Sequence, residues 1–341
     1  MKRTPTKVAK AQALSDGAAL NTGLVVGSHG RHCVVETADG QRVICHPRGK
    51  KSQSVVGDRV RWQAATDEGT IEQVETRRNL FYRQDEIRTK SFAANLDQVL
   101  ILIAAEPEFS ETQLTRALIA AEAEQIRPII ALNKSDLGAL FDQAWQRLAP
   151  YRTMGYTVVP LSLKQAEQQA DHPDQDHPLS PVAAAGQAQL LQLLSGKTTL
   201  VLGPSGSGKS TLINSLVPGA QVVTGEISQA LNSGKHTTTT TTWYWVDSIA
   251  SSSAQRTALI DSPGFQEFGL HHIAPAQLAQ LMPDIKAHAT ECRFYNCTHL
   301  HEPGCGVLAQ VETAAGAGGA ISARRHRIYK QLFEELGQQR W

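Results

Sequence analysis

Three short motifs occur along this chain in an unusual order. N-K-S-D lies at residues 133–136, G-P-S-G-S-G-K-S at residues 203–210, and D-S-P-G at residues 261–264. In the ordinary arrangement of these motifs the glycine-rich loop comes first and N-K-x-D comes last. Here N-K-S-D precedes the glycine-rich loop by about 70 residues. The order therefore predicts an α/β nucleotide-binding domain in which the old termini are joined and the chain is cut elsewhere.

The glycine-rich motif predicts a phosphate-binding loop. It follows an apolar stretch at residues 198–202 and precedes a helical pattern at residues 211–216, which is the strand–loop–helix context that such a loop requires. Its glycines allow successive backbone N–H groups to face phosphate oxygens at a helix N-terminus. Lys209 would reach the β- and γ-phosphates, and the Ser210 hydroxyl would hold Mg²⁺.

The N-K-S-D motif predicts which base is bound. The Asp136 carboxylate can accept hydrogen bonds from N1–H and from the exocyclic amine of guanine. Adenine lacks that pair of donors, so a buried Asp136 would be left unpaired. The Lys134 stem can lie along the base, and the motif follows an apolar strand at residues 128–132, where nucleotides bind. A turn with polar caps is the alternative.

The D-S-P-G motif predicts a sensor of the γ-phosphate. Asp261 would reach Mg²⁺ through water, and the Gly264 N–H would contact the γ-phosphate, which makes the following segment a switch. Many GTPases place a water-positioning glutamine directly after this glycine. This chain has Phe265 there, and a phenyl ring cannot orient water, so another group must do so or intrinsic hydrolysis is slow.

A threonine-rich run at residues 237–242, preceded by His236, lies where the first switch belongs. Thr237 or Thr238 could complete the Mg²⁺ shell, and His236 could position or activate the attacking water. A flexible polar loop with an exposed histidine fits the same spacing equally well.

Three of the five cysteines lie close together near the C-terminus. Cys292, Cys297 and Cys305 flank His299 with the spacing C-x₄-C-x-H-x₅-C. Three thiolates and one imidazole suit a closed tetrahedral Zn²⁺ site. His301 is an alternative ligand, and buried free cysteines in a helical hairpin remain an alternative to metal binding. Cys33 and Cys45 are expected inside β-strands, where they act as small hydrophobic residues.

The chain is predicted to fold into several domains. Residues 1–20 are expected to form a disordered basic tail, and five short strands within residues 21–84 predict an all-β barrel of the OB type. A β domain of another topology is the alternative. Residues 92–272 alternate strands and helices around the nucleotide motifs, interrupted by an expected flexible insertion at 164–187. Residues 273–341 are predicted to be a helical, zinc-binding domain.

Charge is unevenly spread along the chain. Residues 1–90 hold 16 Lys and Arg against 10 Asp and Glu, whereas the rest holds 17 against 22. The basic N-terminal part suggests contact with a polyanion such as nucleic acid, although a solvated basic surface would have the same composition. No run of 18 apolar residues and no signal-peptide pattern occur, so a cytoplasmic protein without membrane contact is expected.

Taken together, these motifs resemble the RsgA family of circularly permuted bacterial GTPases. The likeness covers residues 22–341 and also includes A-N-L-D-Q at residues 94–98 and H-T-T-T at residues 236–239. Two features depart from the family pattern. The 164–187 insertion looks longer and more polar than expected, and the guanine-supporting motif has Ser162-Leu163 in place of Ser-Ala.

The resemblance implies a GTPase that acts in late maturation of the small (30S) ribosomal subunit. It implies that His236 takes part in hydrolysis together with Lys209, Thr237 and Thr238, and that the particle stimulates a slow intrinsic rate. The GTP state would bind the 30S particle and its 16S rRNA, and hydrolysis to GDP would promote release. The protein is expected to be a monomer with one Zn²⁺ per chain and Mg²⁺ bound with GTP. The expected nucleotide contacts are Asn133, Lys134, Asp136, Ser162, Gly203, Pro204, Ser205, Gly206, Ser207, Gly208, Lys209, Ser210, Thr211, Asp261 and Gly264.

Two other functions fit parts of the sequence. The first is an rRNA-binding module whose nucleotide stabilises the fold with negligible hydrolysis, which Phe265 favours. The second is a phosphate-loop ATPase or kinase, against which Asp136 argues.

Overall fold

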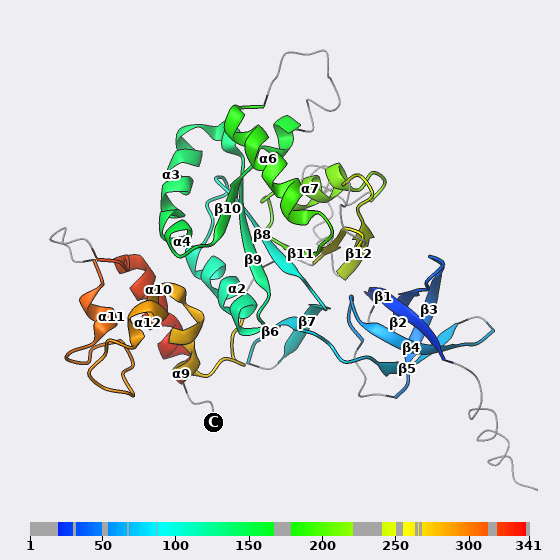
Figure 1. The fold of residues 1–341 in the computed structure, drawn as a ribbon, viewed down its shortest axis with the longest axis horizontal. Coiled ribbons are helices and arrows are strands. Elements are labelled where there is room, and N and C mark those ends of the chain that lie inside the picture. The colour runs from blue at the N-terminus through cyan, green and yellow to red at the C-terminus, as the bar shows by residue number, and fades with distance from the viewer. Residues whose placement is uncertain are drawn as a thin grey trace, which may run out of the picture. The chain divides into compact units, whose positions relative to one another are not determined.

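The computed structural model describes most of the chain and divides it into two compact units. The described residues are 20–29, 32–49, 54–66, 68–86, 88–166, 179–220, 241–249, 255–262, 265, 268–312 and 319–338. The first unit ends at Arg78, and the second begins at Asn79 (Figure 1). The expected N-terminal tail lies almost wholly outside the described residues.

The first unit is a small barrel of five strands. They are β1 (Asn21–His29), β2 (His32–Glu36), β3 (Arg42–Pro47), β4 (Arg59–Ala64) and β5 (Gly69–Val74). β1 pairs antiparallel with both β2 and β4, β2 pairs with β3, β3 runs parallel to β5, and β5 pairs with β4. These pairings close the sheet on itself, which confirms the predicted small all-β barrel.

Alternating residues of the barrel strands build its core. The buried members are Val25, Cys33, Val35, Cys45, Val60, Trp62 and Ile71. Side chains on one strand alternate between the two faces of a sheet, so every second residue of β2 and β3 enters this core. Cys33 and Cys45 are both buried free cysteines, as the sequence predicted.

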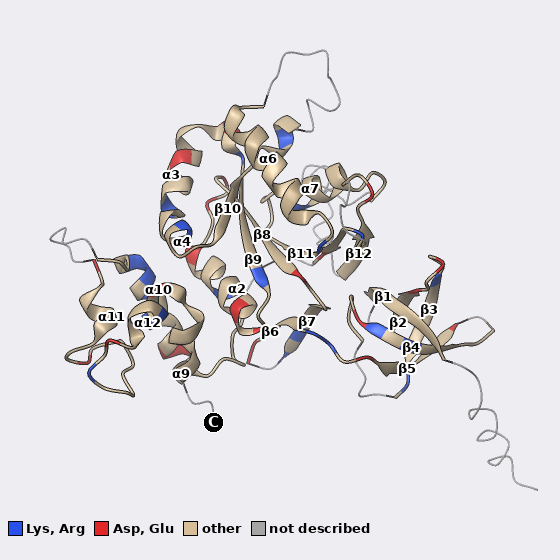
Figure 2. Ribbon diagram, in the orientation of Figure 1, with Lys and Arg blue, Asp and Glu red and all other residues tan. Residues whose placement is uncertain are grey.

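The outer surface of the barrel carries charges of both signs (Figure 2). Arg42 pairs with Glu36, Arg48 with Glu72, and Arg61 with Glu75. Much of the positive excess of residues 1–90 therefore comes from Lys and Arg at positions 2, 3, 7, 10, 31, 50 and 51, which are outside the described ranges.

The second unit is built on a six-stranded sheet in the order β10-β9-β8-β11-β13-β12. The strands are β8 (Gln98–Ala104), β9 (Arg127–Asn133), β10 (Thr157–Pro160), β11 (Thr198–Leu202), β12 (Thr241–Trp245) and β13 (Ala258–Asp261). All neighbouring pairs are parallel except β12 with β13. Every residue of β8 and β11 is buried, as is typical of parallel strands covered on both faces.

Helices cover both faces of this sheet. Figure 1 shows α2 (Glu111–Ala123), α3 (Ala139–Arg147) and α4 (Ala149–Thr153) on one face, and α6 (Pro181–Leu194) and α7 (Lys209–Leu216) on the other. The Ser110 and Ser180 side chains accept hydrogen bonds from backbone N–H groups in the first turns of α2 and α6, which fixes where these helices begin.

One local prediction differs from the structure, and one hairpin was not predicted. Helix α6 begins at Pro181, so the last part of the expected 164–187 insertion is helical rather than flexible. An N-capping Ser180, a proline in the first turn and an alanine-rich sequence explain this helix. In addition, β6 (Leu80–Gln84) and β7 (Thr89–Ala94) form an antiparallel hairpin that the sequence analysis did not predict. Residues 167–178 lie outside the described residues.

The C-terminal part of the second unit is helical. It contains α9 (Pro275–Leu278), the 3₁₀ helix η2 (Ala279–Leu281), α10 (Pro283–Ala289), α11 (Gly306–Ala309) and α12 (Ala323–Gly337). The Cys/His cluster occupies the irregular segment between α10 and α11 rather than a helix. Among the helices that the structure describes, none is both long enough and apolar enough to cross a membrane.

Candidate functional site

The predicted nucleotide-binding residues gather at one edge of the sheet. Asn133 ends β9, Ser162 follows β10, Gly203 follows β11, and Asp261 ends β13. These strands are parallel, so their carboxyl ends meet at the same edge, which is where open α/β sheets bind ligands. Segments that are far apart in the sequence therefore form one site.

The phosphate loop joins β11 to α7 with an unusual backbone. Gly206 and Gly208 have φ angles of +82° and +99°, a backbone region that residues other than glycine rarely adopt. A Cβ at Gly208 would lie 2.3 Å from Asn133 Nδ2. Glycine is therefore required at position 208 for two reasons: the backbone turns through a positive φ angle, and a side chain would clash with Asn133 of the N-K-S-D segment.

Asn133 connects three loops of the site. Its Nδ2 donates to the Ser207 backbone oxygen at 2.9 Å, and its Oδ1 accepts from the Leu163 N–H at 3.0 Å. The Asn133 side chain is buried, so each of these bonds replaces one that would otherwise be made to water. It ties the base-reading loop and the segment after β10 to the phosphate loop.

The carboxylate of Asp136 is held in place by Ser162. Ser162 Oγ donates to Asp136 Oδ1 at 2.7 Å, and the Ser135 N–H donates to the Leu161 backbone oxygen at 2.9 Å. Asp136 is exposed, whereas Ser162 is buried. The departure at Leu163 leaves this arrangement intact because position 163 contributes its backbone N–H to Asn133.

Lys209 and Asp261 form an ion pair between the phosphate loop and the end of β13. Asp261 is buried, and this burial raises the pKa of its carboxyl although Lys209 acts in the opposite direction. The next residue, Ser262, donates to the Val201 backbone oxygen at 2.8 Å. These contacts place one cation and one carboxylate side by side. In phosphate-loop enzymes such a lysine contacts the phosphates and such an aspartate helps to hold Mg²⁺.

Phe265 is buried against another aromatic side chain. It is 4% exposed and packs on Phe268, with ring centroids 5.7 Å apart. Phe268 also contacts Phe81 and Phe92 from the β6–β7 hairpin. The residue that follows the D-x-x-G motif is therefore part of an aromatic cluster.

Some predicted site residues lie outside the described residues. They are His236, Thr237, Thr238 and Gly264, so the structure does not bear on their roles. Lys134, with a left-handed backbone at φ +68°, and Ser210 and Thr211 at the start of α7 are described and lie in the expected segments. Pro204 and Ser205 occupy the phosphate loop between β11 and Gly206.

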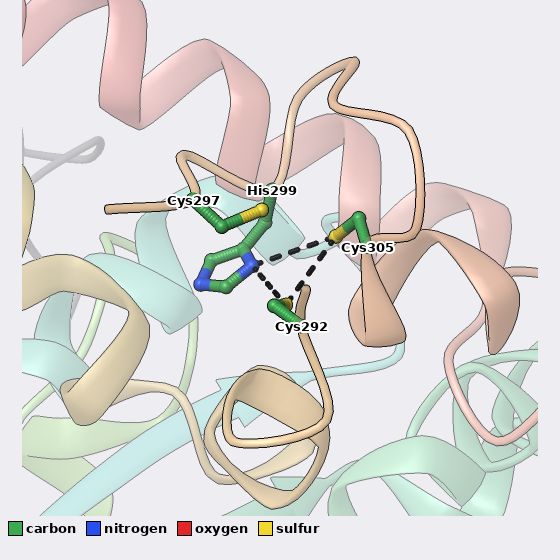
Figure 3. Close-up of side chains that lie close together, drawn as sticks. All are labelled: Cys292, Cys297, His299 and Cys305. Atoms are coloured by element: carbon green, nitrogen blue, oxygen red, sulfur yellow. Dashed lines mark hydrogen bonds between the residues drawn. The ribbon is translucent and has the colours of Figure 1, made fainter. Parts of the chain in front are cut away.

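The three C-terminal cysteines and His299 converge on one point (Figure 3). The Cys292 Sγ lies 3.4 Å from His299 Nδ1 and 3.8 Å from Cys305 Sγ, and Cys305 Sγ lies 3.6 Å from the same Nδ1. All four ligand atoms lie within 4.8 Å of one another. The exposed His301 does not belong to this group, so the predicted set of four ligands is the one that the fold assembles.

Surrounding groups fix the loop that carries these ligands. The Glu302 carboxylate accepts from the backbone N–H of Thr298 at 2.8 Å and of Leu300 at 3.2 Å. Burial acts to raise the pKa of Glu302, but these and neighbouring hydrogen bonds lower it far below its usual value. From α12, His326 contacts the His299 backbone oxygen at 2.8 Å, and the Tyr329 hydroxyl donates to the Thr298 oxygen at 2.9 Å.

Sequence reasoning missed the partners that organise both sites. Asn133 and Ser162 were expected to contact the nucleotide, but their protein partners were not predicted: Asn133 contacts Ser207 and Leu163, and Ser162 contacts Asp136. Asn133 is the last residue of β9 and Ser162 lies two residues after β10, so a polar residue at or just beyond the end of a strand is the signal that marks each of them. Glu302 lies between two cysteine ligands, but its hydrogen bonds follow from loop geometry that spacing does not reveal.

Comparison with known proteins adds an independent finding. The model of the RsgA GTPase family matches residues 74–271. The chain is 68% identical over 339 residues to the small ribosomal subunit biogenesis GTPase RsgA of Variovorax paradoxus, covering 99% of this chain and 98% of the relative. It is 48% identical over 340 residues to the protein of the same name from Burkholderia pseudomallei strain K96243, covering 99% of each.

Two solved structures share the fold. The crystal structure of YjeQ from Thermotoga maritima superposes with a TM-score of 0.67 at 28% identity, over 94% of this chain and all of that one. The structure of YloQ, described as a circularly permuted GTPase, gives a TM-score of 0.63 at 24% identity, over 96% and 99%.

Proposed function

The chain belongs to the RsgA GTPase family, and we propose that it hydrolyses GTP to GDP and phosphate during late maturation of the 30S ribosomal subunit. The observation that carries this proposal is the hydrogen-bonded connection of Asn133 to the phosphate loop and to the segment that holds Asp136. It joins a base reader and a phosphate binder in one site. The names of the full-length relatives supply the small subunit as the particle on which the enzyme acts.

Different residues at the sheet edge would bind the base and the phosphates of GTP. Asp136, oriented by Ser162, accepts the two N–H groups of guanine, and the Lys134 stem covers the base. The loop from Gly203 to Gly208 surrounds the phosphates with backbone N–H groups, and Lys209 leaves Asp261 to contact the β- and γ-phosphates. Ser210 and Asp261 fit the oxygen ligands that Mg²⁺ prefers, and the bound ion would neutralise charge on the phosphates.

Hydrolysis requires a group that positions water for in-line attack on the γ-phosphate. Phe265 is buried among other aromatic side chains and cannot do this, so we assign the role to His236, with Thr237 or Thr238 supporting the ion and Gly264 contacting the γ-phosphate. This assignment rests on the sequence and the family resemblance. It explains why the intrinsic rate would be slow and would depend on the particle.

His236→Ala is expected to lower particle-stimulated GTP turnover by about 100-fold or more, because positioned acid–base groups contribute factors of this size. GTP affinity should change less than about threefold, since no ground-state contact to GTP is assigned to His236. Single-turnover hydrolysis and fluorescent-nucleotide binding would separate the two quantities. His301→Ala, which changes an exposed histidine, is the control, and a full-rate His236 variant would remove the assignment.

Contact with the particle is proposed for the barrel and the C-terminal helical part, both through 16S rRNA. Phe294 is 41% exposed and Tyr295 is fully exposed in the cysteine-bearing segment, beside Arg293. Exposed aromatic and arginine side chains stack on RNA bases. We further propose that the protein acts as a cytoplasmic monomer, that its GTP state binds the particle, and that hydrolysis releases it.

The decisive experiment is GTP turnover by the purified protein alone and with 30S, 50S or 70S particles at physiological salt. Strong stimulation by 30S particles is the expected result. Tight GTP binding with turnover that no particle stimulates would instead favour an rRNA-binding module stabilised by nucleotide, the alternative that the buried Phe265 supports. Equal affinity for ATP and GTP would contradict both.

We also propose that Cys292, Cys297, His299 and Cys305 hold one Zn²⁺. Three thiolates and one imidazole fill a tetrahedral shell and leave no open position, so the ion would be structural. Elemental analysis of protein dialysed against EDTA should find one zinc per chain, and Cys297→Ser should lose it. Cys45→Ala, which removes a barrel thiol, should keep it. Finding no zinc in the wild-type protein would refute the closed site.

A further inference from the structure

A second group of metal-ligand side chains lies on the outer face of the barrel. In the antiparallel pair of β2 and β3, Cys33 lies opposite Cys45. The register therefore also places His32 opposite His46. Because neighbouring residues of a strand point to opposite faces, the two cysteines enter the core and the two histidines point outward. Their rings are in contact, with centroids 4.4 Å apart.

A carboxylate from the residue just before a third strand completes this group. β3 also pairs in parallel with β5, where Gly69 lies opposite Cys45 and Thr70 lies opposite His46. Glu68, two residues before Thr70, is on the same outer face as His46. The Glu68 carboxylate contacts His46 Nε2. One ligand atom from each of the residues His32, His46 and Glu68 lies within 4.8 Å of the other two.

We propose that His32, His46 and Glu68 bind a divalent transition-metal ion. Zn²⁺ suits these ligands best, because it binds both imidazole nitrogen and carboxylate oxygen. Two imidazoles and one carboxylate are a common ligand set for such ions. None of the three side chains is buried, so water would fill the remaining coordination positions. An ion there would link β2, β3 and the start of β5, independently of the nucleotide site and of the cysteine cluster.

A simple surface ion pair does not account for the whole arrangement. The pair formed by His46 and Glu68 has side chains that are 37% and 47% exposed, and such pairs contribute little to stability. The ion pair also does not involve His32. The His32 ring lies against that of His46, although two cationic imidazoles would repel each other. One shared cation would use all three side chains, since each neutral imidazole offers a lone pair.

The test is a calorimetric titration with ZnCl₂ of the tag-free full chain, dialysed against EDTA and retaining the zinc of the cysteine cluster. One additional equivalent should bind. His32→Asn and His46→Asn should each weaken this binding by at least about tenfold, since even residues outside the ligand shell change metal affinity by that factor. Glu68→Gln should weaken it as well.

Glu72→Gln is the matched control, because Glu72 is a carboxylate of β5, four residues after Glu68, and pairs with Arg48 rather than with a histidine. It should leave the affinity of the additional equivalent unchanged. Absence of a second equivalent in the wild-type protein would overturn the proposal. Equal binding by the wild type and the two histidine variants would also overturn it, by showing that the ion binds elsewhere. Circular dichroism of each variant would show that the barrel is still folded.

Discussion

Replacing Asp136 with asparagine is expected to weaken GTP binding by about 100-fold or more. Two hydrogen bonds to a charged acceptor, worth about 1.5–3 kcal/mol each, are replaced by a single one to a neutral oxygen. The NH₂ group of the asparagine would also face the exocyclic amine of guanine, so that two hydrogen-bond donors would oppose each other. Xanthine carries a carbonyl where guanine carries its amine, so the same amide can serve it. The variant should therefore gain affinity for xanthosine triphosphate, measured by competition against a fluorescent nucleotide.

The control for this substitution is Asp142→Asn, which removes an exposed carboxylate from the nearby helix α3. It should leave GTP affinity within about twofold, because an isolated surface charge contributes little. Ser162 can still donate to the asparagine oxygen, so a general collapse of the loop is not expected. Unchanged GTP affinity in Asp136→Asn would remove the guanine assignment, and a loss for both guanine and xanthine nucleotides would indicate misfolding instead.

Much of the fold could be predicted because the relevant signals are local. The strand at Thr198–Leu202 was predicted with its observed bounds, since its apolar run ends at a glycine. The five barrel strands likewise alternate in polarity between turn residues. Hydrophobic period and turn chemistry depend on neighbouring residues and so can be read from the chain.

The contacts that hold the elements together could not be predicted in this way. The hydrogen bond from Asn133 to Ser207 and the ion pair of Arg325 with Asp284 span 74 and 41 residues of sequence. Neither residue type nor spacing reveals such partners. The β6–β7 hairpin was missed because its buried residues, such as Phe81 and Phe92, pack on Phe268, far along the chain. The positions of the buried residues in these two strands are therefore explained only by the tertiary fold.

Arg325 is the clearest of these long-range partners. It is 2% exposed within α12 and donates two hydrogen bonds to the Asp284 carboxylate, at 2.8 Å and 3.0 Å. A third hydrogen bond, at 2.7 Å, goes to Thr115 Oγ1 of α2. The guanidinium also lies 5.1 Å from the ring centroid of Tyr151. One buried cation thus joins the C-terminal helices to the nucleotide-binding part of the second unit.

Arg325→Met is expected to lower the free energy of unfolding of the second unit by about 3–5 kcal/mol, the usual cost of leaving a buried charge unpaired. The side chain of Asp284 is 7% exposed, so water can solvate its carboxylate only poorly. Burial acts to lower the pKa of Arg325, but the two Asp284 hydrogen bonds and charge raise it, and the cation is therefore present at all physiological pH values. Urea denaturation followed by tryptophan fluorescence would measure the loss.

Arg324→Met provides the matched comparison on the same helix. Arg324 has a side chain that is 54% exposed and pairs with Glu111, so its removal should cost no more than about 1 kcal/mol. Adding Asp284→Leu to Arg325→Met should recover most of the lost stability, because an apolar pair can replace a buried ion pair. If the two arginine variants lost equal stability, Arg325 would not be the link between α12 and α2. In that case the contact of Arg116 with Glu335, which joins the same two helices, would be the next to test.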